Sequence, residues 1–126
     1  MTQPSRSAVE FVVYGACRTK KNSGTIIRVR GKLRLIPSKP WSRWVKGAVV
    51  IPRVSRLVDQ PYNCCALFYR DRNSGDAVGY QQGLADALEK WGILSNDRFI
   101  TSWDGTRMLV DRERPRVEVT LTPTTT

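Results

Sequence analysis

The sequence contains no histidine, and this absence excludes several classes of chemistry. Without an imidazole there is no Ser-His-Asp triad, no histidine general base and no histidine ligand for a metal ion. Any hydrolytic activity must therefore run on carboxylates, on a lysine or on a metal-bound water.

Cysteines and long apolar runs are also scarce. The three cysteines, Cys17, Cys64 and Cys65, have neither zinc-ligand spacing nor a CxxC pattern. The longest apolar runs, 11–14 and 47–51, are far shorter than the roughly 18 residues that cross a membrane. Residues 1–7 are polar and lack the apolar region of a signal peptide. These features predict a cytoplasmic protein with no membrane partner.

Acidic residues are few compared with basic ones. There are 21 Lys and Arg against 11 Asp and Glu in 126 residues, which gives a net charge of +10 and a pI near 10.2. Such a charge favours encounter with polyanions, and nucleic acids come first among them. The length predicts one domain, which we place at 9–122, with flexible ends at 1–8 and 123–126.

The pattern of apolar residues predicts an α+β fold, a mixed β-sheet with two helices packed on one face. Cations and aliphatic residues alternate in the first of the two expected hairpins, so we predict one core face and one basic face there. Trp41 and Trp44 have the helical spacing of core residues rather than of a base-stacking platform, whereas the place of Tyr80 is left open. The expected elements are a strand at 9–14, a hairpin at 25–29 and 32–36, a helix from the N-cap Ser38 to about Val50, a strand at 62–70, a helix from about Asp76 to Trp91, a hairpin at 99–103 and 106–110 over Asp104-Gly105, and a strand at 116–122.

Three aspartates in and after the second helix are candidates for chemistry. Asp76 lies at the helix start, Asp86 inside the helix and Asp97 beyond its end. Helix geometry turns Asp86 about 80° from Asp76 and places it about 15 Å along the axis, so those two cannot share one ion directly. Asp76 and Asp97 can meet only if the chain folds back after Gly92. The alternative is structural: a helix-terminal acid, a solvated side chain and a turn residue.

A second group of residues has the composition of a phosphate-binding surface. Arg and Lys match phosphate oxygens, and short polar side chains add hydrogen bonds. The predicted DNA-contacting residues are Arg18, Lys20, Lys21, Asn22, Arg28, Lys32, Arg34 and Lys39.

Several of these motifs occur together and in order along the chain. They are Arg18-Thr19-Lys20-Lys21-Asn22-Ser23, Ile36-Pro37-Ser38-Lys39 before a Trp-containing helix, Asp86-Ala87-Leu88-Glu89-Lys90, Gly92-Ile93-Leu94, Asn96-Asp97, and Asp104-Gly105-Thr106-Arg107 through Pro115-Arg116-Val117-Glu118-Val119. In this order they resemble the RusA-like family of Holliday-junction endonucleases over nearly all of residues 9–122.

The resemblance implies a homodimeric endonuclease that cuts four-way junctions with Mg²⁺, for which Mn²⁺ can substitute. It implies that Asp76 and Asp97 are the catalytic and metal-binding acids, with Asp86 in a supporting role. The chain departs from the family pattern where Val78 replaces the second aspartate and where Gly79, Gln82 and Asn96 replace an asparagine, a lysine and an acid.

These departures leave more than one function open. The first interpretation is a structure-selective endonuclease acting on branched DNA. The second is a RusA-like DNA-binding protein that binds junctions without cutting them, because it has lost a metal-ligand carboxylate at Val78. A basic RNA- or ribosome-associated protein is a third interpretation, which the order of the motifs disfavours.

Overall fold

The computed structural model describes residues 7–19, 25–36 and 39–124, and between 25 and 36 it describes only the side chains of 28–33. The strands are β1 (Val9–Tyr14), β2 (Thr25–Val29), β3 (Lys32–Ile36), β4 (Val49–Ile51), β5 (Tyr62–Arg70), β6 (Ile100–Ser102), β7 (Arg107–Val110) and β8 (Arg116–Pro123). The helices are α1 (Lys39–Gly47), α2 (Ala77–Lys90) and the short 3₁₀ helix η1 (Asp97–Phe99).

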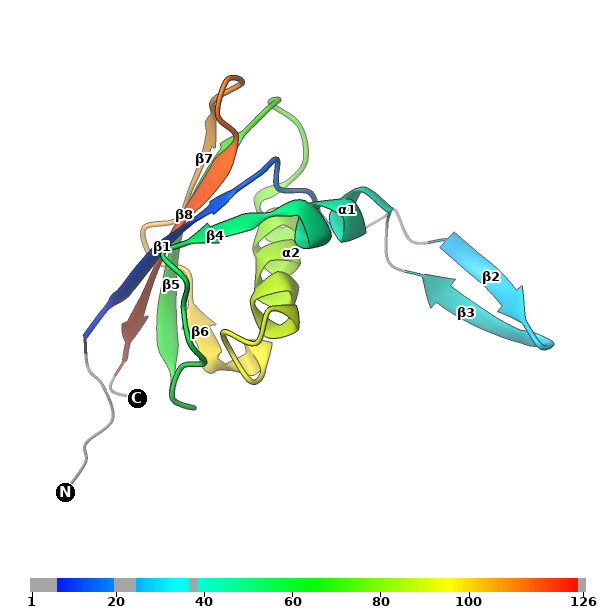
Figure 1. Ribbon diagram of the computed structural model, residues 1–126, viewed down its shortest axis with the longest axis horizontal. Helices are drawn as coiled ribbons and strands as arrows, with labels where there is room; N and C mark the ends of the chain where they lie inside the picture. Colours follow the sequence, from blue (N-terminus) through cyan, green and yellow to red (C-terminus); the bar gives the residue numbers. More distant parts are fainter. Residues whose placement is uncertain (1–6, 20–24, 37–38, 125–126) are drawn as a thin grey trace.

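The main sheet is mixed and has the order β4-β1-β8-β5, with β6 and β7 both on the far edge of β5. Neighbours pair antiparallel as far as β5, whereas β6 and β7 run parallel to it. The two long helices lie on the same side of this sheet (Figure 1). The predicted fold class, α+β with a mixed sheet and two helices, is confirmed.

The core lies between the sheet and the helices. Strand β5 alternates buried and half-buried residues along its whole length, as expected for a strand with one face in a core. Leu84 and Leu88 of α2 are fully buried against this face, and Trp41 and Trp44 of α1 are buried with them. The prediction that both tryptophans serve the core is therefore confirmed.

Helix α2 packs closely against the segment that follows β1. A Cβ atom on Gly83 would lie 2.8 Å from the carbonyl oxygen of Arg18, and one on Gly79 would lie 3.1 Å from Cγ2 of Thr19. The indole of Trp41 donates a hydrogen bond to the Gly83 carbonyl oxygen at 3.0 Å. The two glycines thus allow α2, α1 and residues 18–19 to meet.

Helix α1 is shorter than predicted, and the strand after it was missed. The helix ends at Gly47 rather than near Val50, and Val49–Ile51 forms the edge strand β4 against β1. The local sequence is apolar and is compatible with either a helix or a strand. Pairing with the edge of β1, which lies far back in the sequence, makes it a strand.

The predicted hairpin over Asp104-Gly105 is wrong. Strands β6 and β7 do not pair with each other but lie one after the other along the same edge of β5. Between them the Asn63 side chain accepts a hydrogen bond from the Asp104 amide, and the Thr106 hydroxyl group accepts one from the Ala66 amide. The Asp104-Gly105 turn therefore interrupts an edge strand instead of reversing it.

The hairpin β2–β3 forms as predicted around Arg30-Gly31, but its two faces are not those predicted. It is a separate two-stranded sheet that projects away from the body of the molecule (Figure 1). Its register pairs Arg28 with Leu33 and Val29 with Lys32. Directly opposed residues share a face, so each face carries a cation and an aliphatic residue. Neither a core face nor a purely basic face results.

The C-terminal end of the domain lies beyond its predicted limit. Strand β8 includes Pro123, which pairs with Tyr62, and the Thr124 amide donates a hydrogen bond to the Pro61 carbonyl oxygen. Of the flexible ends predicted at 1–8 and 123–126, residues 1–6 and 125–126 lie outside the described residues. Among the described residues, no helix is long and apolar enough to cross a membrane.

Candidate nucleic-acid interface and acidic groove

The charges of the chain are strongly segregated along the sequence. Between Glu10 and Asp59 there is no acidic residue, and this acid-free segment, residues 11–58, carries more than half of all cations. The rest of the chain contains the other nine Lys and Arg and all eleven acids, so its net charge is slightly negative. The twelve cations of the acid-free segment are Arg18, Lys20, Lys21, Arg28, Arg30, Lys32, Arg34, Lys39, Arg43, Lys46, Arg53 and Arg56.

Helix α1 carries the most regular part of this charge. Lys39, Arg43 and Lys46 follow one another at helical spacing and are all exposed, on the side opposite the buried tryptophans. We call these three residues the α1 stripe. Only Lys39 of the stripe was predicted to bind DNA; the absence of acids from 11–58 is the sequence signal that identifies the other two.

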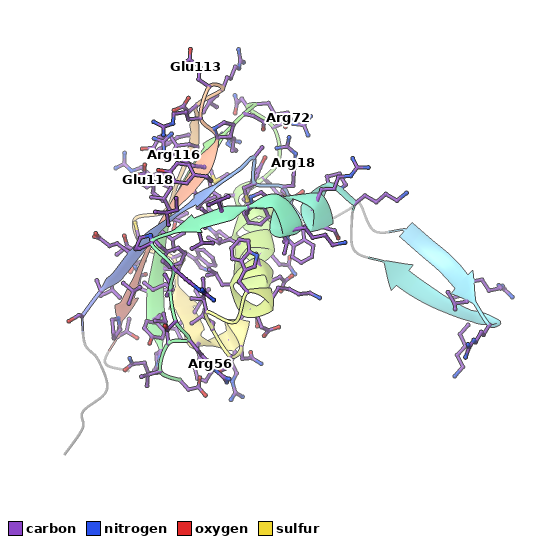
Figure 2. All side chains as sticks on the ribbon, in the orientation of Figure 1. Arg18, Arg56, Arg72, Glu113, Arg116 and Glu118 are labelled. Atoms are coloured by element: carbon purple, nitrogen blue, oxygen red, sulfur yellow. The ribbon has the colours of Figure 1, made fainter. Side chains whose placement is uncertain are left out.

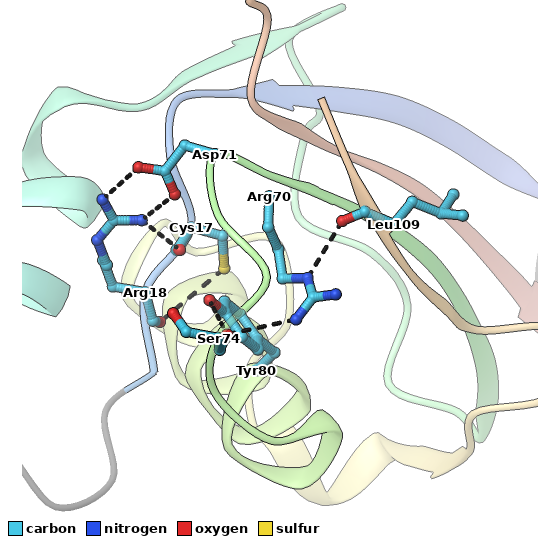
Figure 3. Close-up of polar contacts among 7 residues, drawn as sticks. All are labelled: Cys17, Arg18, Arg70, Asp71, Ser74, Tyr80 and Leu109. Atoms are coloured by element: carbon cyan, nitrogen blue, oxygen red, sulfur yellow. Dashed lines mark hydrogen bonds and ion pairs between the residues drawn. The ribbon is translucent and has the colours of Figure 1, made fainter. Parts of the chain in front are cut away.

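Arg18, which is predicted to contact DNA, is paired within the chain. Its guanidinium donates two hydrogen bonds of 2.8 Å to the carboxylate of Asp71, and a third to the Cys17 carbonyl oxygen (Figure 3). This pairing holds the pKa of Asp71 below its usual range and raises that of Arg18. Arg18 therefore connects the segment after β1 to the end of β5, and its charge is largely compensated.

We call residues 18–23 the basic loop, of which Arg18 and Thr19 are described and lie beside the start of α2. Thr19 lies against Gly79 in the first turn of α2. The predicted ligands Lys20, Lys21 and Asn22 lie outside the described residues, as does the side chain of Arg34. The side chains of Arg28 and Lys32 are described and exposed on the hairpin.

Asp76 occupies the N-cap of α2. Its backbone is extended, and its carboxylate accepts a hydrogen bond of 2.6 Å from the amide of Gly79. This is the structural role that the sequence offered as the alternative to metal binding. The residue is exposed, so the cap stands at the surface where the basic loop departs.

Asp97 lies in a shallow groove on the side of α2. It begins η1, and its amide donates a hydrogen bond to the Glu89 side chain at 3.1 Å. Val78 and Gln82 line the same groove, with Val78 63% exposed. The fold-back after Gly92 thus brings Asp97 to the positions at which the chain departs from the RusA-like pattern. The groove, about 230 Å³ in volume, is lined by Val78, Gln81, Gln82, Ala85, Asp97, Ile100 and Trp103.

Asp86 lies in a different place from Asp97. It lines a separate hollow with Trp41, Glu89 and Lys90. Within the described part of the chain, no three acidic, histidine or cysteine side chains gather closely enough to hold a metal ion. The structure therefore does not bring the three predicted acids together in one cluster of that kind.

A buried polar network, which sequence reasoning missed, supports the start of α2. Arg70 is only 6% exposed and donates hydrogen bonds to the carbonyl oxygens of Leu109 and Ser74 (Figure 3). It donates a third to the Asn73 side chain. The Tyr80 hydroxyl group donates to the same Ser74 carbonyl oxygen, and burial raises its pKa. No local pattern marks Arg70, because its partners come from β7 and from the loop before α2.

The acids near the start of β8 are compensated by arginine. Arg116 donates hydrogen bonds of 2.9 Å to Glu118 and to Asp111, and its guanidinium lies 3.9 Å from the centre of the Tyr69 ring. Figure 2 shows Arg116 and Glu118 together at the sheet, apart from the hairpin β2–β3. Arg116 is thus engaged within the chain, unlike the exposed cations of the α1 stripe.

Two comparisons with known proteins give no further information on the site. No protein-family model matches the sequence, and a search of curated proteins finds no match. The resemblance to RusA-like endonucleases therefore stays a prediction from the motifs.

Proposed function

We propose that this protein binds DNA, with branched duplexes such as four-way junctions as its target. The observation that carries the proposal is the acid-free segment, whose described cations are all exposed except the paired Arg18. They lie on α1, on the hairpin, and at Arg53 and Arg56 after β4. Lys and Arg on such a surface replace counterions at the phosphate backbone, and this release drives binding. The nearly balanced charge of the other residues directs the polyanion to this part of the molecule.

The segment that leads into Lys20 and Lys21 supports a contact between DNA and the body of the molecule beside α2. Thr19, which precedes these two lysines, lies against Gly79 in the first turn of the helix. The Asp76 carboxylate already accepts a hydrogen bond from the Gly79 amide, so cations rather than the helix N-terminus would attract the phosphates.

A second candidate function is Mg²⁺-dependent hydrolysis of the bound DNA, with Asp76 and Asp97 as the essential acids and Asp86 in support. The favouring observation is that Asp97 lines one groove with Val78 and Gln82, although it comes fifteen residues after Gln82 in the sequence. These are positions at which the RusA-like pattern has functional residues.

The groove does not offer the ligand set that Mg²⁺ prefers. Among its described lining residues Asp97 is the one carboxylate, and Asp76 already caps α2. Mg²⁺ prefers near-octahedral oxygen ligands, commonly one or two carboxylates with waters and substrate phosphate. A groove with a valine in place of an acid would hold the ion weakly, so we derive no catalytic step from it.

The experiment that tests both candidates is a titration of a synthetic four-way junction with and without Mg²⁺ or Mn²⁺. We expect salt-sensitive binding that favours the junction over a linear duplex of equal length. Cleavage that is lost in Asp76→Asn and Asp97→Asn, with binding retained, would establish the second candidate. Binding without cleavage under any ion would leave a non-catalytic protein, and Val78→Asp is then the gain-of-function variant.

We also propose that the protein is a homodimer and is located in the cytoplasm. A two-fold dimer presents two equivalent surfaces, which matches the symmetry of a four-way junction. Light scattering at micromolar concentration measures this directly. A monomer mass in the presence of full junction binding would contradict it.

A further inference from the structure

We call the hairpin β2–β3 the arm. Among the described residues, no third strand extends its sheet. The arm forms its own two-stranded sheet, and of its described aliphatic residues Val29 is 39% and Leu33 is 68% exposed. A two-stranded hairpin alone is marginally stable in water. The described part of the arm therefore leaves apolar surface open to a partner.

The tip of the arm is cationic and has an unusual backbone. Arg28, Arg30 and Lys32 are exposed within five consecutive residues. Arg30 and Gly31 have φ of +53° and +79°, the positive values that a two-residue type I′ turn requires at both central positions. Asn, Asp or Gly is favoured at the first of them, and an arginine there costs about 1 kcal/mol. A cation thus occupies the outermost turn despite a conformational cost.

Both faces of the arm have the same mixed character. Arg28 lies opposite Leu33 on one face, and Val29 lies opposite Lys32 on the other. A β-hairpin that packs on a protein surface needs one apolar face. A β-hairpin inside a DNA groove lies between two rows of phosphates, so cations and apolar residues are useful on both of its faces. The major groove of B-DNA, about 12 Å wide, admits a two-stranded ribbon as it stands, whereas the minor groove, about 6 Å wide, takes one only when the duplex is deformed at a cost in free energy.

We propose that the β2–β3 arm inserts into the major groove of duplex DNA. Arg28, Arg30 and Lys32 contact the phosphates of the groove walls or the acceptor edges of guanine, and Leu33 makes apolar contact with the base edges. The inference rests on the proposed DNA-binding function and extends it. The arm reaches a duplex segment away from the α1 stripe, as recognition of a branched substrate requires.

The test separates groove insertion from general attraction by charge. Binding of a labelled junction is measured over a range of salt for Leu33→Ser and for the double variant Arg28→Ala with Lys32→Ala. Leu33→Ser should weaken binding roughly tenfold at every salt concentration, with the slope against salt unchanged, because it removes an apolar contact and no charge. The double variant should reduce that slope by about 2, because each lost phosphate contact contributes about 0.9.

Matched controls come from the main sheet. Ile51→Ser changes an aliphatic residue that is 54% exposed on β4, and Arg107→Ala with Arg112→Ala removes two exposed cations from β7 and the turn after it. Both should bind like the parent protein. Dimethyl sulfate, which methylates guanine N7 in the major groove, should be excluded by the parent protein and admitted by the arm variants.

The possible failures are distinct. If the parent protein does not bind DNA at low salt, the proposed function fails and the groove contact fails with it. If the parent binds and the arm variants bind and protect guanine equally well, only the arm inference is overturned. It is also overturned if light scattering shows that Leu33→Ser dissociates a dimer, because the arm would then contact a second copy of the chain.

Discussion

Among single residues, Arg18 shows how a cation in a basic segment can serve the fold rather than a ligand. Its bidentate pair with Asp71 joins two segments more than fifty positions apart, and both side chains are partly exposed, 22% and 29%. Partly exposed pairs contribute little, but two parallel hydrogen bonds are the favourable geometry. The pair consequently fixes the base of the loop that carries Lys20 and Lys21.

We expect Arg18→Ala to lower the free energy of unfolding by about 1 kcal/mol at pH 7. The Asp71 carboxyl has a folded-state pKa below its ordinary value of 3.8. Its contribution is therefore present above that value and is lost as the pH falls through the lower, folded-state pKa. Urea unfolding of parent and variant should accordingly give curves that converge in strong acid.

Lys39→Ala is the control for this measurement. Lys39 is exposed in the first turn of α1, and its removal should change stability little and equally at all pH values. A difference between Arg18→Ala and the parent that persists unchanged in strong acid would show that Asp71 is not the partner that matters.

Arg70 gives the second prediction, because it is a buried cation held by neutral oxygen atoms. Arg70→Met should destabilise the protein by about 3 kcal/mol, since it leaves the carbonyl oxygens of Leu109 and Ser74 without their donor. Amide hydrogen exchange should accelerate in β7 more than in β1. Arg72→Met, at an exposed neighbouring position, is the control; equal losses in the two variants would refute the role of burial.

Sequence reasoning at this scale succeeded where the signal is local. Asp76 lies at a helix start, and an acid at the helix terminus was named as the alternative to metal binding; the structure makes it the N-cap. Tyr80 was left open because its burial depends on Arg70 and Ser74, which only the folded chain brings to it. For the same reason, the pairing of Arg18 with Asp71 could not be read from the loop composition.

Among the elements, the contact of α2 with residues 18–19 depends on the absence of a side chain. We predict that Gly83→Ala destabilises the protein by about 2 kcal/mol, although alanine is the better helix former. The new Cβ would lie 2.8 Å from the Arg18 carbonyl oxygen, a backbone atom that cannot rotate away. Thermal unfolding measures the loss.

Gly47→Ala is the matched substitution. Its Cβ would have no neighbour within 4 Å at the end of α1, so it should be neutral or should stabilise by up to about 1 kcal/mol. If Gly83→Ala were as harmless as Gly47→Ala, the close packing of α2 on this segment would not exist in solution.

The elements themselves were predictable where one face is buried along a whole segment. Strand β5 was found at its observed bounds because alternation over nine residues is a strong signal. Strand β4 was missed, and β6 and β7 were found as strands but with the wrong partner, because short apolar segments do not specify what they pair with. The mixed faces of the β2–β3 arm follow from the turn length, which sets residues of opposite parity against one another.

For the whole molecule, the segregation of charge yields a prediction about binding. Lys20→Ala with Lys21→Ala should weaken junction binding and reduce the slope against salt by about 2. The melting temperature should stay nearly the same, because surface substitutions away from packed features have small effects. A large loss of stability with unchanged affinity would show that the loop serves folding.

Charge made part of the candidate site predictable from the sequence. Net charge predicted a nucleic-acid ligand, which stays a prediction, and eight residues were named from the basic segments. The structure adds Arg43 and Lys46 and finds Arg18 engaged with Asp71, because exposure and pairing depend on the folded chain. For the acids, a fold-back after Gly92 was named as the condition for Asp97 to meet Asp76; in the structure Asp97 lines a groove with Val78 and Gln82.

The position of β8 in the sheet has a consequence for the order in which the protein can assemble. This strand pairs with β1 on one side and β5 on the other, and it is the last element along the chain. While residues 9–70 emerge from the ribosome, β1 and β5 each expose an edge whose partner has not been synthesised. Unpaired edges of this kind invite association between chains. Productive folding must therefore wait for 116–123, which makes this strand the step on which the speed and yield of folding depend.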